Sequence, residues 1–243
     1  MKTKKILIIS ATHGNEKIGV EVVKMLRQKK LNRYFDFLIA NPKALRENKR
    51  FLDADLNRSY PGRKNSPIYE KKLAYENFQK AKKYKYIIDI HEASEGINNF
   101  IIVPRRTVSK KFPLGFINMK LVLLWPEPKG PLGGFLENAV ELEFGMKNKQ
   151  RKKVVAKAEQ IITNFINNIC CQNKITYKRR QKLYYVYDFL RMDNPFSPLK
   201  RFKDFKKTVF KGEEFYPLLV GQYIKEKIVC YKMKLLNKTK EPL

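Results

Sequence analysis

Short apolar runs alternate with amphipathic stretches over the first 170 residues. The runs predict strands at Lys5–Ser10, Asp36–Ala40, Tyr86–His91, Phe100–Val103, Leu121–Trp125 and Ala139–Phe144. Each run is short and bounded by polar or turn-forming residues, which is typical of strands in a covered sheet. Strands that alternate with helices in this way predict an α/β fold in which helices cover a central sheet.

Three segments have the periodicity of amphipathic helices. The first opens near Glu16 and places apolar residues on one face, namely Ile18, Val22, Met25 and Leu26. The second is expected to begin at Ser66-Pro67, because a capping residue followed by proline is typical of a helix start. The third carries apolar residues at helical spacing from Val154 to Ile169, so its apolar face is expected to pack on the sheet.

The composition of the chain changes after about residue 173. Aromatic and β-branched runs dominate there, and pairs such as Asn194-Pro195, Ser197-Pro198 and Lys211-Gly212 separate them. This is the composition of short strands joined by turns. We therefore expect two domains: a catalytic domain over residues 1–172 and a small β-rich domain over residues 173–243.

Composition narrows the protein class. The chain has 243 residues, of which 43% are hydrophobic, enough for a sizeable core. Its cysteines are Cys170, Cys171 and Cys230, without CxxC spacing, which argues against a disulfide framework or a cysteine zinc site. The first apolar run stops at Ser10, too short for a secretory signal, and no run approaches the ~18 apolar residues of a membrane span. We expect a cytoplasmic protein without a membrane segment.

The chain is strongly basic, with 52 Lys and Arg against 23 Asp and Glu, a formal net charge of +29. Such a charge is typical of proteins that bind nucleic acid or anionic membranes. The lysines are spread along the whole chain, however, and no recognisable nucleic-acid motif accompanies them. A solvated, lysine-rich surface explains the lysines equally well. The net charge alone therefore does not distinguish a polyanion-binding protein from one with a basic surface.

The two histidines of the chain both lie where a predicted strand ends, beside a carboxylate. They occur in Thr12-His13-Gly14-Asn15-Glu16 and Asp89-Ile90-His91-Glu92. Two imidazoles and one carboxylate form a common catalytic zinc set, which leaves a fourth position for water. Glu16 lies three residues after His13 and can turn back toward the same point. Either motif alone also fits a structural or surface histidine, and the pair together favours the metal site.

Several ordered motifs resemble those of the succinylglutamate desuccinylase/aspartoacylase family, a branch of the zinc carboxypeptidase-like hydrolases. The resemblance covers His13-Gly14-Asn15-Glu16, Asn41-Pro42 through Arg58, Asp89-Ile90-His91 and Val140-Glu141-Leu142-Glu143-Phe144-Gly145. It implies a mixed central sheet flanked by helices, with a small β-rich C-terminal domain. It also implies one zinc ion per chain and a small N-acyl amino acid as substrate.

The resemblance assigns roles residue by residue. His13, Glu16 and His91 would bind zinc, and Glu143 would be the catalytic carboxylate. Arg50 would polarise the scissile carbonyl. The remaining candidates would contact substrate. Asn57 and Arg58 would hold its α-carboxylate, and Tyr223 is the first candidate for a tyrosine from the C-terminal part, with Tyr231 as the alternative.

Residue chemistry supports parts of this assignment. Glu141 and Glu143 alternate on one face of an apolar strand, and Glu143 is nearer its carboxyl end. A solvent-facing edge charge is the alternative for Glu143. Asp89 and Asp55 are candidates for orienting the histidine rings, and Asp55 is equally placed to hold Arg50. Glu92 and Glu95 are interpreted as loop charges.

The chain departs from the family pattern between Pro126 and Asn138. Aspartoacylase-like members have an arginine there that reads a side-chain carboxylate, whereas this stretch has Lys129 and no arginine. Arg105-Arg106 fits either a replacement clamp or a basic surface pair. We therefore predict a zinc-dependent deacylase of undefined specificity, for which a homo-oligomer is one option. The alternatives are a carboxypeptidase or cell-wall peptide amidase, a basic nucleic-acid-binding protein, and an inactive family member with a binding role.

Overall fold

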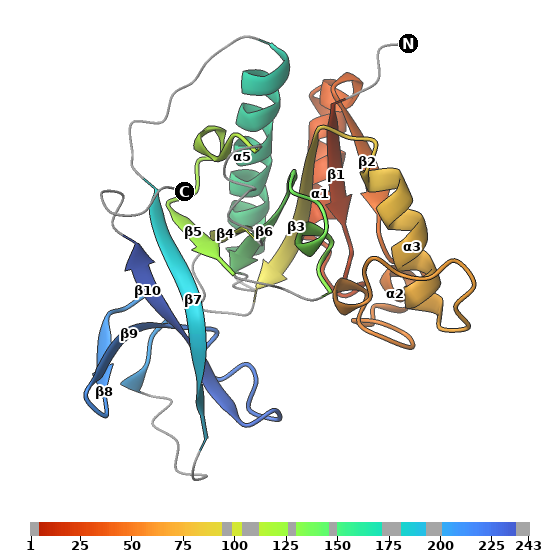
Figure 1. The fold of residues 1–243 in the computed structure, drawn as a ribbon. Helices are drawn as coiled ribbons and strands as arrows, with labels where there is room; N and C mark the ends of the chain where they lie inside the picture. Colours follow the sequence, from red (N-terminus) through yellow and green to blue (C-terminus); the bar gives the residue numbers. More distant parts are fainter. Residues whose placement is uncertain are drawn as a thin grey trace.

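The computed structural model describes residues 5–93, 99–103, 112–125, 130–145, 150–171, 181–192 and 201–236. Within these residues one ten-stranded sheet has the strand order β2-β1-β3-β6-β4-β5-β7-β10-β9-β8 (Figure 1). Its strands are β1 (Ile6–Ser10), β2 (Phe35–Ile39), β3 (Tyr86–Ala93), β4 (Phe100–Val103), β5 (Leu121–Leu124), β6 (Ala139–Gly145), β7 (Lys182–Arg191), β8 (Thr208–Phe210), β9 (Glu213–Leu218) and β10 (Ile228–Leu236). The helices are α1 (Ile18–Gln28), α2 (Pro42–Glu47), α3 (Tyr69–Ala81) and α5 (Arg151–Cys170).

The sheet is mixed, and its parallel part positions the site. Strands β2, β1, β3 and β6 pair in parallel, so their carboxyl ends lie at one edge. β4 then runs antiparallel to β6 and parallel to β5. In open α/β sheets, side chains that follow the carboxyl ends of neighbouring strands converge on one crevice.

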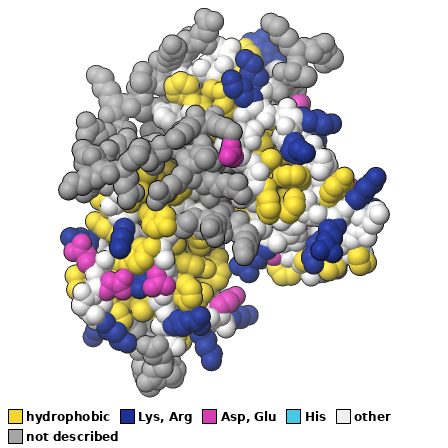
Figure 2. All heavy atoms as spheres, viewed as in Figure 1, with side chains coloured by type: hydrophobic (Ala, Val, Ile, Leu, Met, Phe, Trp, Pro, Cys, Tyr) yellow, Lys and Arg dark blue, Asp and Glu magenta, His cyan; other side chains and the backbone are white. Residues whose placement is uncertain are grey.

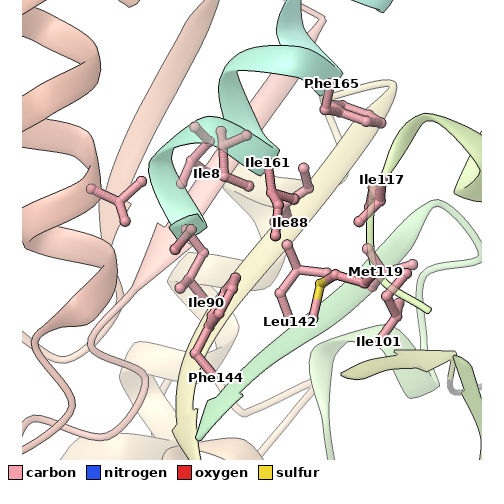
Figure 3. Packing of buried hydrophobic residues seen from close by; sticks show 14 of the residues in the cluster. Ile8, Ile88, Ile90, Ile101, Ile117, Met119, Leu142, Phe144, Ile161 and Phe165 are labelled. Carbon is pink, nitrogen blue, oxygen red and sulfur yellow. The ribbon is translucent and has the colours of Figure 1, made fainter. Parts of the chain in front are cut away.

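Helices cover both faces of this sheet because its strands alternate apolar side chains to both sides. Ile6 and Ile8 of β1 belong to the buried cluster that α1 and α5 complete, and Figure 3 shows Ile161 and Phe165 of α5 packed over it. Leu7 and Ile9 face the other way, into a second cluster completed by Ala74 and Ala81 of α3. The strands are therefore buried on both faces, as in other parallel sheets.

The C-terminal part is rich in strands and continues the same sheet. β7 pairs in parallel with β5, and β10, β9 and β8 follow as antiparallel neighbours. In Figure 1 these strands extend away from the helices. The expected domain boundary at residues 172–173 stays a prediction, because residue 172 and those after it up to 180 are outside the described part of the chain.

The six strands expected in the first 170 residues occur within two residues of their predicted ends. The expected start of the second helix at Ser66-Pro67 is wrong, because α3 begins at Tyr69. Ile68 keeps an extended backbone, and the Tyr69 amide is capped by the Asp53 carboxylate at 3.0 Å. A contact from a distant loop thus sets this helix end in place of the local Ser-Pro signal.

The charge distribution on the surface agrees with its spread along the sequence. On the face shown in Figure 2, Lys and Arg side chains are scattered over the N-terminal and C-terminal parts. Among the described residues, no helix combines the length and the apolar character that a bilayer crossing requires.

The contact of α5 with the sheet gives a test of the core. Phe165 is fully buried and stacks on Phe112 with 5.2 Å between ring centroids. Phe165→Ala leaves a cavity, so we expect a loss of about 3–5 kcal/mol in the free energy of unfolding, measured in urea. Lys157→Ala, at an exposed position of the same helix, should change it by less than ~0.5 kcal/mol. Equal effects of the two variants would contradict this packing.

Candidate metal centre and active site

Three side chains converge at the carboxyl ends of β1 and β3. His13 follows β1, Glu16 follows three residues later, and His91 lies in β3. The Glu16 carboxylate bridges the rings: Oε1 is 2.7 Å from His13 Nδ1, and Oε2 is 3.0 Å from His91 Nδ1. One ligating atom from each residue lies within 4.8 Å of the other two, and all three residues are buried. The strand pairing Ser10↔Ile90 produces this meeting point.

The segment after β1 turns sharply to bring His13 over the sheet. Ala11 takes the left-handed conformation with φ of 54°, which is uncommon for a residue with a side chain. Gly14 lies against α2, where an added Cβ would be 2.1 Å from the Ala44 carbonyl carbon. The Gly14 amide also donates to the Arg50 carbonyl at 3.1 Å. Glycine is thus required here for close approach, and this approach joins the His13 turn to the loop that carries Arg50.

The outward ring nitrogens face two aspartates. His13 Nε2 is 3.1 Å from Asp55 Oδ1, and His91 Nε2 is 3.2 Å from Asp89 Oδ2, although the latter pair lacks hydrogen-bond alignment. Thr12 Oγ1 donates to both oxygens of Asp89. Carboxylates behind ligating histidines fix the ring orientation and raise the basicity of the free nitrogen. Both Nδ1 atoms are therefore presented toward Glu16.

The charges of this cluster favour a cation. Burial alone would lower the pKa of His13, but its hydrogen bonds with Asp55 and Glu16 raise it. Burial would raise the pKa of Glu16, yet the two histidines hold it well below its usual range. The pKa of Asp55 is lowered in the same way, to about 2. The carboxylates of Glu16 and Asp55 therefore stay ionised at a buried position, and this negative charge favours the binding of a metal ion.

The donor set fits zinc. Two imidazoles, each with an aspartate carboxylate near its second ring nitrogen, and the Glu16 carboxylate form a three-residue site of the catalytic type. All the donor atoms come from one continuous cluster of described residues. His13, Glu16 and His91 would hold the ion, as predicted from the sequence, and the identity of the metal stays a prediction.

Two glutamates of β6 extend the cluster along the sheet. Glu143 pairs in register with His91, and Glu141 pairs with Asp89. Leu142 and Phe144 point to the opposite face and are fully buried in the core. Burial raises the pKa of both Glu141 and Glu143 to about 7. The alternation expected from the sequence therefore places both carboxyl groups on the metal side of the sheet.

The loop after α2 brings two arginines to the same place. Arg50 Nη2 is 3.3 Å from Asp55 Oδ2, and Arg50 Nη1 is 3.5 Å from Glu16 Oε1. Asp55 therefore serves both roles considered for it, because it contacts His13 and Arg50 at once. The side chain of Asp55 also accepts a hydrogen bond from the backbone N–H of Asn57 at 2.9 Å, and this bond caps the 3-10 turn η2 (Leu56–Arg58).

A buried glutamate that sequence reasoning missed holds this loop in place. Glu70 of α3 has 0% exposure, and its carboxylate accepts from the backbone amides of Leu52, Asp53 and Ala54 at 2.8 to 3.1 Å. Asn41 Nδ2 donates to the same carboxylate at 3.2 Å. The sequence offered no signal, because an acid in the first turn of a helix is ordinarily solvated.

Glu92 also differs from its interpretation as a loop charge. Its Oε1 accepts from the amides of Lys17 and Ile18 at 2.5 and 2.6 Å, so it caps the start of α1. Arg151 of α5 donates to both of its oxygens. Glu92 thereby joins β3, α1 and α5 behind the histidines. Glu95, Arg105-Arg106 and Lys129 lie outside the described residues.

One cavity of about 570 Å³ contains all the predicted site residues. The described residues that line it include His13, Glu16, His91, Glu143, Arg50, Asn57, Arg58 and Tyr223. Phe100 and Ile102 of β4, Trp125 directly after β5 and Tyr231 of β10 contribute further to the wall. The size is that of a site for a small molecule. The individual roles of these residues in catalysis and binding stay predictions.

The fold and the site together define a class of metallohydrolase-like α/β proteins. A model of the succinylglutamate desuccinylase/aspartoacylase catalytic domain matches residues 2–169. The chain belongs to this family, as its motifs indicated. The family assignment made from His13, Arg58, His91 and Glu143 with their neighbours is thereby confirmed.

Solved structures confirm the fold class. The succinylglutamate desuccinylase from Chromobacterium violaceum superposes with a TM-score of 0.75 at 17% identity, over 97% of this chain and 86% of that one. Murine aminoacylase 3 superposes with a TM-score of 0.71 at 18% identity, over 96% and 95%. The mixed sheet with flanking helices and a β-rich C-terminal part is thus the zinc carboxypeptidase-like fold expected.

Curated relatives match more locally. A probable aspartoacylase from Prochlorococcus marinus is 32% identical over 120 residues, which is 42% of this chain and 39% of that protein. An N-acyl-aromatic-L-amino acid amidohydrolase (carboxylate-forming) from Xenopus laevis is 31% identical over 116 residues, 41% and 37% of the two chains. The match therefore spans about two fifths of the length of these relatives.

The Glu70 contacts predict an effect on the arginine loop. Glu70→Ala removes the acceptor that three part-buried backbone amides share, so we expect a loss of about 3 kcal/mol in unfolding free energy. Amide hydrogen exchange at residues 52–54 should accelerate more than exchange in β1. Glu76→Ala, an exposed acid on the same helix, is the matched control and should leave both measurements unchanged. Unaltered exchange in Glu70→Ala would refute this role.

The position of Asp55 behind His13 predicts an effect on metal affinity. Asp55→Asn keeps the shape of the side chain but loses its charge, so zinc affinity should fall by about 10- to 100-fold. Competition with a chromophoric chelator measures this change. Asp53→Asn makes the same substitution in the same loop, at the cap of α3, and should leave the affinity within about twofold. Identical affinities for the two variants would mean that Asp55 does not support the metal site.

Proposed function

We propose that this protein is a zinc-dependent hydrolase that cleaves the amide bond of a small N-acyl amino acid. The observation that carries this proposal is the convergence of His13, Glu16 and His91 in a cavity that also holds Glu143 and two arginines. Family membership supports the same reaction class.

The proton transfers fall to Glu143. A zinc ion at this site would supply Lewis acidity, which activates water and polarises a carbonyl group. Glu143 accepts the proton of the attacking water and then donates it to the amine nitrogen, which cannot leave as an anion. Its pairing with His91 on β3 places it next to the metal ligands. Burial raises its pKa to about 7, which suits a group that both accepts and donates a proton near neutral pH.

The arginine loop orients the substrate. Arg50, held between Glu16 and Asp55, donates to the carbonyl oxygen as negative charge develops on it. Arg58 and Asn57 bind the α-carboxylate, for which a guanidinium and an amide are suited donors. Tyr223 faces the same cavity from the C-terminal part and interacts with Arg58.

The experiment is a hydrolysis assay on zinc-loaded protein with a panel of N-acetyl amino acids. The wild-type chain should bind about one zinc ion and release acetate and a free amino acid. His13→Ala and His91→Ala should each lose both metal and activity. Glu143→Gln should keep the metal while kcat falls by about 10²- to 10⁴-fold.

A surface substitution supplies the control for the assay. Glu76→Gln makes the same chemical change as Glu143→Gln at an exposed position of α3 and should retain full activity. Full metal content in both histidine variants would disprove the ligand assignment. Undiminished kcat in Glu143→Gln would disprove the proton-transfer role.

A further inference from the structure

Glu141 is a buried carboxyl group in the cavity to which the proposed reaction assigns no step. It lies two residues before Glu143 on the same face of β6, so it is about 6–7 Å deeper below the edge of the sheet. Its neighbours in register are Asp89 on β3 and Ile102 on β4. It lines the cavity, yet only 5% of its surface is exposed. Glu141 therefore forms part of the floor of the site.

One oxygen atom of the floor carboxylate lacks a partner among the described residues. The Glu141 side chain interacts with the side chain of Asn57, but its Oε1 atom is buried and has no hydrogen-bond partner there. A buried polar atom without a partner costs about 1–3 kcal/mol, so such atoms are typical of places where a ligand completes the bonding. Glu141 Oε1 is an acceptor, and its complement is a ligand group that donates.

The charges around the cavity favour a cationic donor. Among the described residues that line it, six are acidic, namely Glu16, Asp55, Glu92, Glu141, Glu143 and Glu226, whereas the basic ones are Arg50, Arg58 and the two histidines. This excess of acid occurs in a chain with a net charge of +29. Glu16 and Asp55 contact the histidines directly, and Glu141 is the most deeply buried of the other four. A second carboxylate on a substrate would be repelled at this position.

The wall next to Glu141 is apolar. Ile102 pairs in register with Glu141 and Phe100 with Glu143, and both side chains line the cavity. A substrate side chain with several methylene groups and a terminal cation matches this surface. Its methylene groups pack on the apolar wall while the cation reaches the Glu141 carboxylate.

We propose that Glu141 selects substrates whose amino acid half carries a cationic side chain, of the lysine or ornithine type. This inference rests on the proposed function, which places the reacting nitrogen at Glu143 and the α-carboxylate at Arg58 and Asn57. In this arrangement the Cα atom of the substrate lies between Glu143 and Arg58, and the substrate side chain extends toward Glu141. The distance from Glu143 down to Glu141 suits the reach of an extended aminoalkyl chain.

The test compares two nearly isosteric substrates on the zinc-loaded protein, Nα-acetyl-L-lysine and Nα-acetyl-L-norleucine. Their side chains differ chiefly in the terminal ammonium group. The wild-type kcat/KM should favour the lysine substrate, and Nα-acetyl-L-aspartate should be the poorest of the three. Glu141→Gln should lower the lysine-to-norleucine ratio by about 10- to 100-fold while it leaves norleucine hydrolysis nearly unchanged.

Glu226→Gln is the matched control, because it removes an exposed carboxylate from the rim of the same cavity. Its ratio should stay within about threefold of the wild type, since exposed charges are screened by solvent. Equal losses on both substrates in Glu141→Gln would mean a structural role and would overturn the proposal. A wild-type ratio near one would overturn it as well.

Binding of the free amino acids separates this proposal from the proposed function. Calorimetry with L-lysine and L-norleucine requires no turnover. Lysine should bind more tightly than norleucine, and Glu141→Gln should abolish the difference. If no substrate is hydrolysed and this difference is still seen, the proposed reaction fails while the assignment of Glu141 stands. Equal affinities for L-lysine and L-norleucine would refute the assignment of Glu141, whether or not the protein hydrolyses a substrate.

Discussion

The parallel pairing of β1, β3 and β6 is the constraint on which the rest of the structure depends. It aligns Ser10 with Ile90 and His91 with Glu143, so that three segments far apart in the sequence end at one edge. On the face of the sheet that α3 covers, side chains change from apolar to ionisable toward that edge: Ile87 precedes Asp89 and His91, and Ala139 precedes Glu141 and Glu143. A shift of one residue in either pairing would move these side chains to the opposite face.

Three buried or part-buried carboxylates hold together the segments that surround this edge. Glu70 orders the arginine loop through backbone amides, and Glu92 caps α1 and pairs with Arg151. Asp55 contacts a histidine and an arginine at the same time. Each of these carboxylates gains hydrogen bonds from donors that a distant segment supplies, which compensates for the loss of water. The site is therefore held by tertiary contacts between loops, in addition to the strand ends themselves.

The acidity of the cavity contrasts with the basic surface. Lysines are spread over the outside, whereas the described cavity wall is rich in carboxylates. In the proposed reaction, this wall together with Arg50 and Arg58 would accommodate a metal ion and one substrate carboxylate. The same balance disfavours a second substrate carboxylate, which agrees with the absence of an arginine between Pro126 and Asn138 in the sequence.

The strands and the histidine, glutamate and arginine motifs were predictable from the sequence, because periodicity and short-range spacing encode them. The start of α3 was not predictable, since Asp53 rather than Ser66 caps it. The roles of Glu70 and Glu92 were equally hidden, because their partners lie at least 16 residues away in the chain. The order of motifs along the sequence was enough to nominate the candidate residues of the site. Only the tertiary structure decided that Glu141 is buried beside them, since burial depends on how neighbouring strands pair and which segments cover their ends.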